Sequence, residues 1–550
     1  MNADSLFSWK LLDKPKMEKA CKLLNKHLEN NDNIFIPIDS DCDGYNAAAI
    51  LINFLYYYYP HHVRSYVVWQ HHSSKQHGLE DMMGSIPYDT KLVIVTDAGS
   101  NDIEQHKLLA ARGIDCIVLD HHEVSVDIEE SPATIINVQS CNYPNKALTG
   151  GGVVYKFCQA YHDQYLSGME SIDNKLIDSC AIANIGDMAD YHEPEIRAIV
   201  NIGLKTLENP FIKGLADAHQ YTLSKRNGMN YLSCAFAIVP FINAICRSGT
   251  EEEKNLIFSS MLEKDAYNPI FSSKRGHTGE LCLLWEEAVT VAERVKRRQT
   301  KVQDEAMKYF EQQIQSEDLN NNAMLFLLDK DDTIAPEVRG LIANKIQAKY
   351  QKPTAVLTPI EQEDGHIKLC GSMRNYSLSV NQDLKATLEG TGLAKCAGHA
   401  NAAGLFIEEN NLNALCNKMN DIYKNIDQTP TYWVDYIWHN TADFDKVMDI
   451  GKLNIYGQGI PESFVAIEDL DLSQCSVQLL SRDKNPTLKI VLPNGVTIMK
   501  FKSSEEEYEE FLSDHAVLTC IGTCAINNWN GQVTPQIILE NMELREEWIF

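Results

Sequence analysis

Short apolar runs alternate with polar or helical stretches over the first 140 residues of the chain. The runs that resemble strands are residues 33–38, 63–69, 92–96, 116–119 and 135–136, and a helical pattern covers residues 47–57. This alternation predicts a parallel α/β sheet, in which functional loops lie at the carboxyl ends of the strands. An aspartate directly follows three of the runs, namely Asp39, Asp97 and Asp120. We therefore expect these three carboxylates at one edge of the sheet.

The pattern changes after this region. Residues 150–280 are mostly helical in pattern, and residues 280–315 contain few helix breakers, which predicts one long connecting helix. Residues 323–425 return to α/β alternation, with strands expected at 323–328 and 354–357 and a helix at 338–350.

The last 120 residues are β-rich. Strands are expected at residues 476–480, 488–492 and 517–521, and the pairs Asn494-Gly495 and Asn530-Gly531 are typical of hairpin turns. A small β-barrel after a boundary near Pro430 would explain this pattern. We therefore expect an α/β protein with four domains, which span residues 1–205, 206–322, 323–428 and 429–550.

Composition limits the compartment and the partners. The 15 cysteines are scattered and form no CxxC pair, so a disulfide framework or a zinc ribbon is not expected and a reducing cytosol fits. The chain has no run of 18 apolar residues and no secretion signal at its N-terminus, so neither a membrane span nor secretion is expected. A net charge of −27 argues against a chain coated in basic nucleic-acid-binding surface, but not against a local basic channel.

Four clusters of acidic and histidine residues are the candidates for chemistry. A calcium-binding EF-hand loop begins like the first cluster, but it needs a glutamate at its twelfth position, which is Ile50 here. Singly, an aspartate after a strand is usually a helix cap or a turn residue. In combination, carboxylates and imidazoles suit manganese, and magnesium where carboxylates dominate. The clusters are Asp39-Ser40-Asp41-Cys42-Asp43-Gly44, Thr96-Asp97-Ala98-Gly99, Asp120-His121-His122 and Gly186-Asp187-Met188.

Two metal ions about 3.5–4 Å apart can polarise a phosphoester and lower the pKa of a bridging water. This arrangement needs one carboxylate that bridges the ions and further ligands that hold each ion separately. Asp97 is the bridging candidate, and Asp41 and Asp43 are expected to face different ions. His121 is expected to be a nitrogen ligand, and Asp187 is expected to complete the ligand set of the second ion.

The remaining residues of the clusters have supporting roles in this hypothesis. Asp39 belongs to the metal-ligand set. Asp120 is a candidate to orient a histidine from outside the ligand shell, which leaves His122 for the phosphate or for a proton. The clusters by themselves thus predict metal-assisted phosphoester hydrolysis.

At these residues the chain resembles the DHH phosphoesterase superfamily, and over almost its whole length it is similar to the RecJ single-strand-specific exonucleases. The clusters correspond to the motifs IDSDCDG, VTDAGS, LDHHE and NIGDMAD. Further matches follow in the family's order: NYPNKALTGGGVVYKF, PFINAICR, APEVRGLIANKIQAKYQKPTAVL, GSMRN, AGHANAAG, YGQGIPE and WNGQVTPQIILEN. The resemblance implies a parallel-sheet DHH domain, a helical region with the long connector, an α/β DHHA1 domain and a C-terminal β-barrel of the OB-fold type.

The resemblance also implies a 5′→3′ exonuclease that acts on single-stranded DNA in repair, recombination or replication, with two divalent cations, Mn²⁺ or Mg²⁺. Ser372 and Arg374 match the family's serine-x-arginine motif for the terminal 5′ phosphate, and a guanidinium group and a hydroxyl bind phosphate well. His399 of the GHANAAG turn would act on backbone phosphate near the metals. Asn243 and Arg247 of PFINAICR would lie near the metals or the nucleic acid.

One departure from the family affects recognition of the DNA end. The family has an arginine in the loop after its second strand, whereas this region reads WQHHSSKQHGL here. His72 falls near the arginine position and Lys75 is a candidate substitute, so both are assigned to phosphate binding. Whether the enzyme depends on a 5′ phosphate therefore stays open.

Two other functions stay open as well. DHH–DHHA1 phosphodiesterases for short oligonucleotides or cyclic dinucleotides resemble the first and third domains but lack the long helical connector and the OB-like tail. A DHH scaffold that has lost catalysis would have broken motifs, whereas all four are intact here. We expect a cytoplasmic monomer that binds single-stranded DNA, with a single-strand-binding protein or a helicase as candidate partners.

Overall fold

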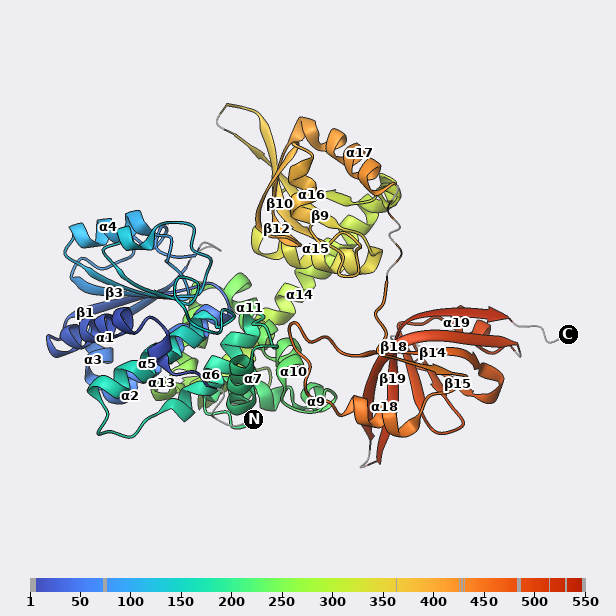
Figure 1. Cartoon of the computed structure of the whole chain (residues 1–550), viewed down its shortest axis with the longest axis horizontal. Helices are drawn as coiled ribbons and strands as arrows, with labels where there is room; N and C mark the ends of the chain where they lie inside the picture. The colour runs from blue at the N-terminus through green and yellow to red at the C-terminus, as the bar shows by residue number, and fades with distance from the viewer. Residues whose placement is uncertain are drawn as a thin grey trace. The chain divides into compact units, whose positions relative to one another are not determined.

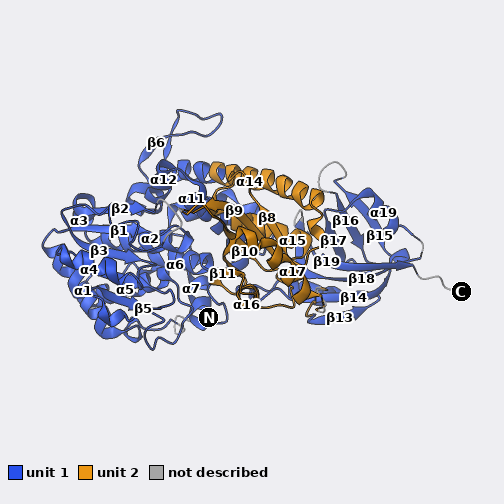
Figure 2. Ribbon diagram, turned by 90° about the horizontal axis from the view of Figure 1, so that it is seen from above, with its two compact units in different colours: residues 1–293, 434–550 blue, residues 294–433 orange. Residues whose placement is uncertain are grey.

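The computed structural model describes residues 6–72, 77–362, 364–424, 426, 429, 431–481, 486–513, 515–529 and 532–546. The chain forms two compact units (Figure 2). Unit 1 comprises residues 1–293 and 434–550, and unit 2 comprises residues 294–433. All fifteen cysteines are free thiols.

The N-terminal part of unit 1 is built on a five-stranded sheet, sheet A, in which every pair of neighbouring strands is parallel. The predicted parallel α/β sheet is confirmed. One expected strand differs, because residues 63–66 belong to helix α3 (Pro60–Tyr66), whose first residue suits the first turn of a helix. The strands, in the spatial order β2-β1-β3-β4-β5, are Val67–His71, Asn33–Ile38, Thr90–Thr96, Asp115–Asp120 and Thr134–Asn137.

Helices cover both faces of sheet A (Figure 1). Phe35, Val93 and Val118 pack on one face in a core cluster with residues of α4 (Ile103–Ala111). Helices α1 (Lys14–Glu29), α2 (Cys42–Tyr58) and α5 (Gly150–Tyr165) contact the strands from the other face, and α6 (Asp173–Gly186) and α7 (Pro194–Gly203) follow. Burial on both faces explains why these strands are continuous apolar runs in the sequence.

A helical region completes this part of unit 1. Its helices are α8 (Pro210–Ala218), α9 (Gln220–Ser224), α10 (Tyr231–Ala237), α11 (Val239–Ser248), α12 (Glu251–Met261) and α13 (Glu263–Ala266). The stretch Tyr231–Ser248 is long and apolar enough to cross a membrane by length and composition, but 56% of it is buried, as is typical of core helices. The predicted long helix is α14 (Leu284–Ser316). It begins four residues later than expected, because β7 (Leu281–Leu283) pairs with β6 (Pro269–Phe271) in a hairpin.

Unit 2 contains a second five-stranded sheet, sheet C, with the order β11-β12-β10-β9-β8, in which only β8 and β9 are parallel. Side chains of α14 and α15 pack on one face, and side chains of α16 and α17 pack on the other. The elements are β8 (Leu325–Leu328), α15 (Pro336–Tyr350), β9 (Thr354–Glu361), β10 (Ile367–Arg374), α16 (Leu384–Gly390), β11 (Ala394–His399), β12 (Ala402–Glu408) and α17 (Leu412–Tyr423).

The C-terminal part of unit 1 is a seven-stranded mixed sheet, sheet D, with the order β13-β14-β18-β19-β17-β16-β15. The predicted turn at Asn494-Gly495 lies between β16 and β17, where Gly495 has a φ of +91°. The turn predicted at Asn530-Gly531 lies outside the described residues. The elements are β13 (Tyr436–His439), α18 (Phe444–Gly451), β14 (Phe464–Asp471), β15 (Ser476–Leu480), β16 (Thr487–Val491), β17 (Thr497–Phe501), α19 (Glu505–Phe511), β18 (Ala516–Trp529) and β19 (Gln532–Glu546).

Candidate metal centre

The ends of β1, β3 and β4 bring three carboxylates to the carboxyl edge of sheet A. Asp39 follows β1, Asp97 follows β3, and Asp120 is the last residue of β4; all three side chains are buried. Asp97 has a φ of +65°, which turns its side chain away from the strand direction, and its N–H donates to Leu119 C=O at 2.8 Å. Aspartate tolerates this left-handed conformation better than most residues.

The first turn of α2 adds two further aspartates. Asp41 caps the helix, accepting a hydrogen bond from Gly44 N–H at 2.9 Å. Asp43 lies buried in the first turn and accepts hydrogen bonds of 2.8 Å from the N–H groups of both Gly150 and Gly151. These two residues begin α5, so the positive end of a helix faces the buried carboxylate.

Glycines at the start of α5 make room for the acids. A Cβ on Gly150 would lie 2.2 Å from Asp97 Oδ1, and a Cβ on Gly151 would lie 3.0 Å from Asp43 Oδ1. From the sequence, these glycines were known only as part of a segment that matches the family, with no role assigned to them. The structure gives the physical reason, which is close approach of the helix backbone to the carboxylates.

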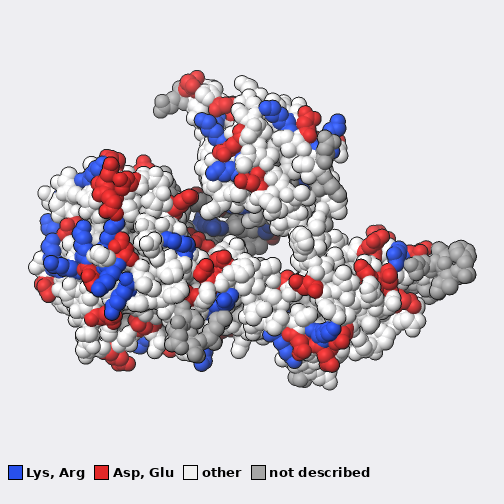
Figure 3. All heavy atoms as spheres, viewed as in Figure 1, with Lys and Arg blue, Asp and Glu red and all other residues white. Residues whose placement is uncertain are grey.

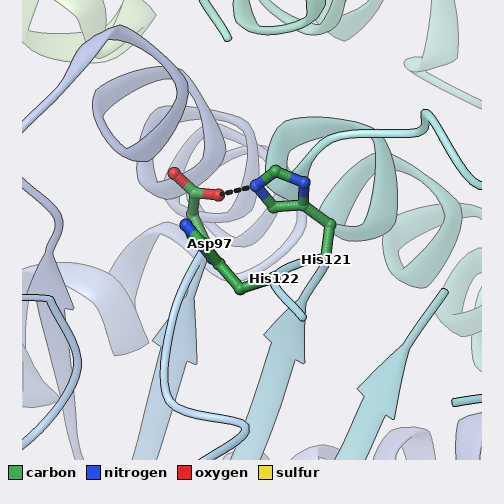
Figure 4. A group of neighbouring side chains, drawn as sticks. All are labelled: Asp97, His121 and His122. Carbon is green, nitrogen blue, oxygen red and sulfur yellow. Dashed lines mark ion pairs between the residues drawn. The ribbon is translucent and has the colours of Figure 1, made fainter. Parts of the chain in front are cut away.

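The acids and histidines form three overlapping groups of possible ligand atoms. Asp39, Asp41 and Asp97 form the first group, Asp43, His121 and Asp187 form the second, and Asp97, His121 and His122 form a third; within each group the ligand atoms lie within 4.8 Å of one another. His121 Nε2 lies 3.1 Å from Asp97 Oδ1 (Figure 4), so Asp97 joins the first group to the second. This placement fits two cations with Asp97 between them.

The electrostatics of the groups also fit divalent cations. Burial, followed by the charges of Asp43 and Asp41, raises the pKa of Asp97 well above its usual range. The same two causes raise the pKa of Asp187 to about 8. Bound cations would offset this repulsion, and a mixed set of carboxylate oxygens and one imidazole nitrogen suits Mn²⁺.

Asp120 orients His122 rather than His121. Its Oδ1 atom accepts hydrogen bonds from His122 Nδ1 at 2.8 Å and from His121 N–H at 2.7 Å, and its Oδ2 atom accepts one from Ser100 N–H at 2.9 Å. Burial opposes ionisation of Asp120, but the hydrogen bond and charge of His122 outweigh it and lower the pKa. Burial also opposes the charge on His122, yet the contact with Asp120 raises its pKa to about 9. His122 is therefore a half-exposed imidazole that Asp120 orients, and it belongs to the third group of possible ligand atoms.

His77 is a residue of the site that the sequence did not reveal. Its Nδ1 atom lies 2.6 Å from Asp39 Oδ2, its side chain is 51% exposed, and its ring centroid lies 5.7 Å from that of His122. The feature that could have indicated His77 is its position in the loop after β2, which lies at the same edge of sheet A as the aspartates.

The structure describes only one of the two residues predicted to replace the family's arginine. His72 is buried, with Nδ1 2.9 Å from Asp81 Oδ1 and Nε2 4.0 Å from Asp39 Oδ1. This burial disfavours the phosphate contact predicted for His72, because the imidazole does not reach the solvent. Lys75 lies outside the described residues.

Helix α11 connects the helical region to the acidic edge. Asn243 Oδ1 accepts a hydrogen bond of 3.2 Å from the N–H of Cys42, which lies between Asp41 and Asp43. Asn243 thus lies near the ligand groups and supports the start of α2. Arg247 lies one turn further along α11 and is half-buried.

In unit 2, sheet C brings the three predicted phosphate-binding residues to one face. Arg374 pairs with Ala402, which pairs with His399 on the next strand, and Ser372 lies two residues before Arg374 on β10. Residues in register, or two apart on one strand, share a face of a sheet. A Cβ on Gly340 of α15 would lie 2.5 Å from Arg374 Nη2, so this glycine gives the guanidinium its space.

Comparisons with known proteins agree with this architecture. Residues 33–184 match the model of the DHH family N-terminal domain, and residues 438–541 match that of the RecJ OB domain. A protein of Bacillus subtilis (strain 168) derived from the SPbeta prophage, provisionally assigned as single-strand DNA-specific exonuclease YorK, is 32% identical over 544 residues, which cover 96% of this chain and 90% of that protein.

More distant relatives extend the comparison. The single-stranded-DNA-specific exonuclease RecJ of the same organism is 23% identical over 560 residues, covering 97% of this chain and 64% of that protein. The crystal structure of RecJ from Thermus thermophilus in complex with Mn²⁺ matches with a TM-score of 0.71 at 20% identity, covering 98% of this chain and 73% of that one. This structural match supports the fold.

Proposed function

Because the chain belongs to the DHH family, as a relative of the RecJ single-strand-DNA-specific exonucleases, we propose that it degrades single-stranded DNA from the 5′ end with two divalent cations. The observation that carries this proposal is the position of Asp97 between two groups of ligand atoms. Asp39, Asp41 and Asp97 would hold one cation, and Asp43, His121 and Asp187 the other. When bound, the two cations, Mn²⁺ or Mg²⁺, would polarise the phosphodiester and activate water.

The protein's own residues prepare the reaction. The start of α5 fixes Asp43 through two backbone N–H groups, so this ligand needs no rearrangement when DNA binds. Asp120 holds His122 in place and favours its protonated form, which can donate a hydrogen bond to a phosphate oxygen. His77 is held beside it by Asp39 and is available for the same role.

An acidic chain can still bind DNA through local basic surface. On the face shown in Figure 3, lysine and arginine side chains gather at the left, where Figure 1 places helix α1. Five lysines belong to α1. The OB domain is a further candidate for binding the strand, because such domains track single strands through aromatic and basic side chains. Cytosolic location, a monomeric state and protein partners stay predictions.

The direction of digestion tests the proposed function. With Mn²⁺ and a long single strand, label at the 5′ end should be released first as short products, while label at the 3′ end stays in long products until late. Release from the 3′ end first would contradict the proposed polarity. Preference for a dinucleotide over the long strand would instead favour the phosphodiesterase alternative, in which the OB domain has no evident use.

Arg374→Ala should weaken binding of strands that carry a 5′ phosphate. Loss of one charged hydrogen-bonding partner costs about 1.5–3 kcal/mol, which corresponds to roughly a 10–100-fold rise in KM. The measurement compares KM for 5′-phosphate and 5′-hydroxyl strands, and the preference between them should shrink in the variant. Lys368→Ala is the matched control, since Lys368 lies on the same strand and face but pairs with Glu408. Equal effects of the two variants would remove Arg374 from end recognition.

A further inference from the structure

A turn that leads into the OB domain packs directly on the segment after Asp187. The turn is formed by residues 457–460, whose first and last members exchange backbone hydrogen bonds of 2.9 and 3.0 Å. The segment, residues 188–192, connects α6 to α7. Tyr191 N–H donates to Gln458 C=O at 2.8 Å, so the two pieces of chain are joined through their backbones. Both belong to unit 1.

Two glycines allow the turn to approach this closely. A Cβ on Gly457 would lie 2.8 Å from atoms of the Tyr191 ring. A Cβ on Gly459 would lie 2.5 Å from Asp190 Oδ1 and 2.7 Å from His192 Nδ1, and Gly459 also has a φ of +81°. Because the Tyr191 ring is buried, a side chain at position 457 would push the turn away from the segment. At position 459 a side chain would displace Asp190 and His192 and add backbone strain at a positive φ.

Helix α10 holds the same segment from another side. The Tyr231 hydroxyl donates to Ala189 C=O at 3.3 Å, and its ring centroid lies 4.9 Å from that of Tyr191. The side chain of Asp187 is 40% exposed, whereas that of Asp43 in the same ligand group is 1% exposed. The Asp187 side chain is therefore less enclosed than that of Asp43, and its position depends more on the backbone that follows it.

We propose that the turn at residues 457–460 positions Asp187, so that affinity for one of the two cations depends on how the OB domain is seated on segment 188–192. This inference rests on the proposed function, because it takes Asp187 as a metal ligand. The glycines are positioning residues that act through the segment. A second consequence follows from linkage, since metal binding must then stabilise the contact between turn and segment by the same free energy. Capture of a strand by the OB domain would in this way be tied to loading of the metal site.

Calorimetric titration of Mn²⁺ into the full-length protein tests this inference. Gly459→Ala should weaken Mn²⁺ binding at one site by about tenfold, as expected for loss of a group that orients a metal ligand. Gly495→Ala is the matched control, because Gly495 also has a positive φ in the same domain but a Cβ there would meet nothing closer than 3.7 Å. Its Mn²⁺ affinity should equal that of the wild-type protein.

Equal Mn²⁺ affinities of the two folded variants would overturn the inference. If Gly459→Ala does not fold, hydrogen exchange of the wild-type protein decides, because Mn²⁺ should slow exchange of the Tyr191 amide that donates to Gln458. Unchanged exchange at this amide, with Mn²⁺ bound, would overturn this inference but not the proposed function. Absence of Mn²⁺ binding by the wild-type protein would overturn the proposed function and this inference with it.

Discussion

Asp97→Asn should abolish exonuclease activity while leaving the fold intact. Loss of the shared carboxylate removes a ligand that adjoins both groups, and cations contribute several kcal/mol of transition-state stabilisation, so a fall of about a thousandfold or more in kcat is expected. Asparagine is the suitable replacement, because it tolerates the φ of +65° at this position and keeps the shape of the side chain. Alanine would add backbone strain to the loss of the charge.

When neither protein has metal bound, the same variant should be more stable than the wild-type protein. An acid whose pKa is raised on folding makes the folded state bind more protons than the unfolded state, so stability falls as pH rises. For Asp187, with a pKa raised from 3.8 to about 8, this penalty is absent below pH 3.8 and fully present above about pH 8. Removal of the neighbouring charge at Asp97 relieves the repulsion, so metal-free Asp97→Asn should melt at a higher temperature at pH 8.

Activity assays and thermal melts with and without Mn²⁺ measure both effects. Asp318→Asn is the matched control, since Asp318 also has a left-handed backbone, with a φ of +54°, but is exposed and lies outside the ligand groups. It should change neither activity nor the metal dependence of melting. Retention of wild-type activity by Asp97→Asn would refute the assignment of Asp97 as the bridging ligand.

Glu195→Ala should have the largest effect on stability. Glu195 and Lys156 form an ion pair of 2.9 Å and are 0% and 1% exposed. The carboxylate also accepts hydrogen bonds from the Tyr143 hydroxyl at 2.8 Å, from Asn145 Nδ2 at 3.1 Å and from Phe7 N–H at 3.0 Å. Removal of one member of a buried ion pair leaves the other charge uncompensated and costs about 3–5 kcal/mol.

Thermal melting of the full-length protein should show this loss as a fall of roughly 10 °C in the Tm of the transition that contains unit 1. Activity per folded molecule at low temperature should stay near the wild-type value, because the network lies apart from the ligand groups. Glu193→Ala is the control, since Glu193 lies two residues away and makes no capping hydrogen bond with its side chain.

A double variant separates charge burial from packing. Glu195→Leu combined with Lys156→Met should recover much of the stability, because apolar residues of similar volume can replace a buried ion pair at little cost. If Glu195→Ala melts at the same temperature as Glu193→Ala, the buried network contributes little to stability and the prediction is wrong.

The order of elements and the chemical class of the site could be predicted from the chain alone. Strands buried on both faces must be apolar throughout, so β1, β3 and β4 were visible as runs, and the aspartate after each run marked one edge of the sheet. The separation of Asp41 from Asp43 was also foreseeable, because positions two residues apart at a helix start point in different directions. The structure has them in different ligand groups.

The residues that surround these acids became known from the three-dimensional fold. His77 and His72 are five residues apart, yet one is half exposed beside Asp39 and the other is buried against Asp81. The partners of Glu195 come from positions 50 and 188 residues away, and the glycines at 457 and 459 meet residues near 190. Such contacts depend on the packing of distant segments, and packing leaves no periodic signal in the chain. The sequence therefore indicated the candidate ligands, whereas the fold specified their environment.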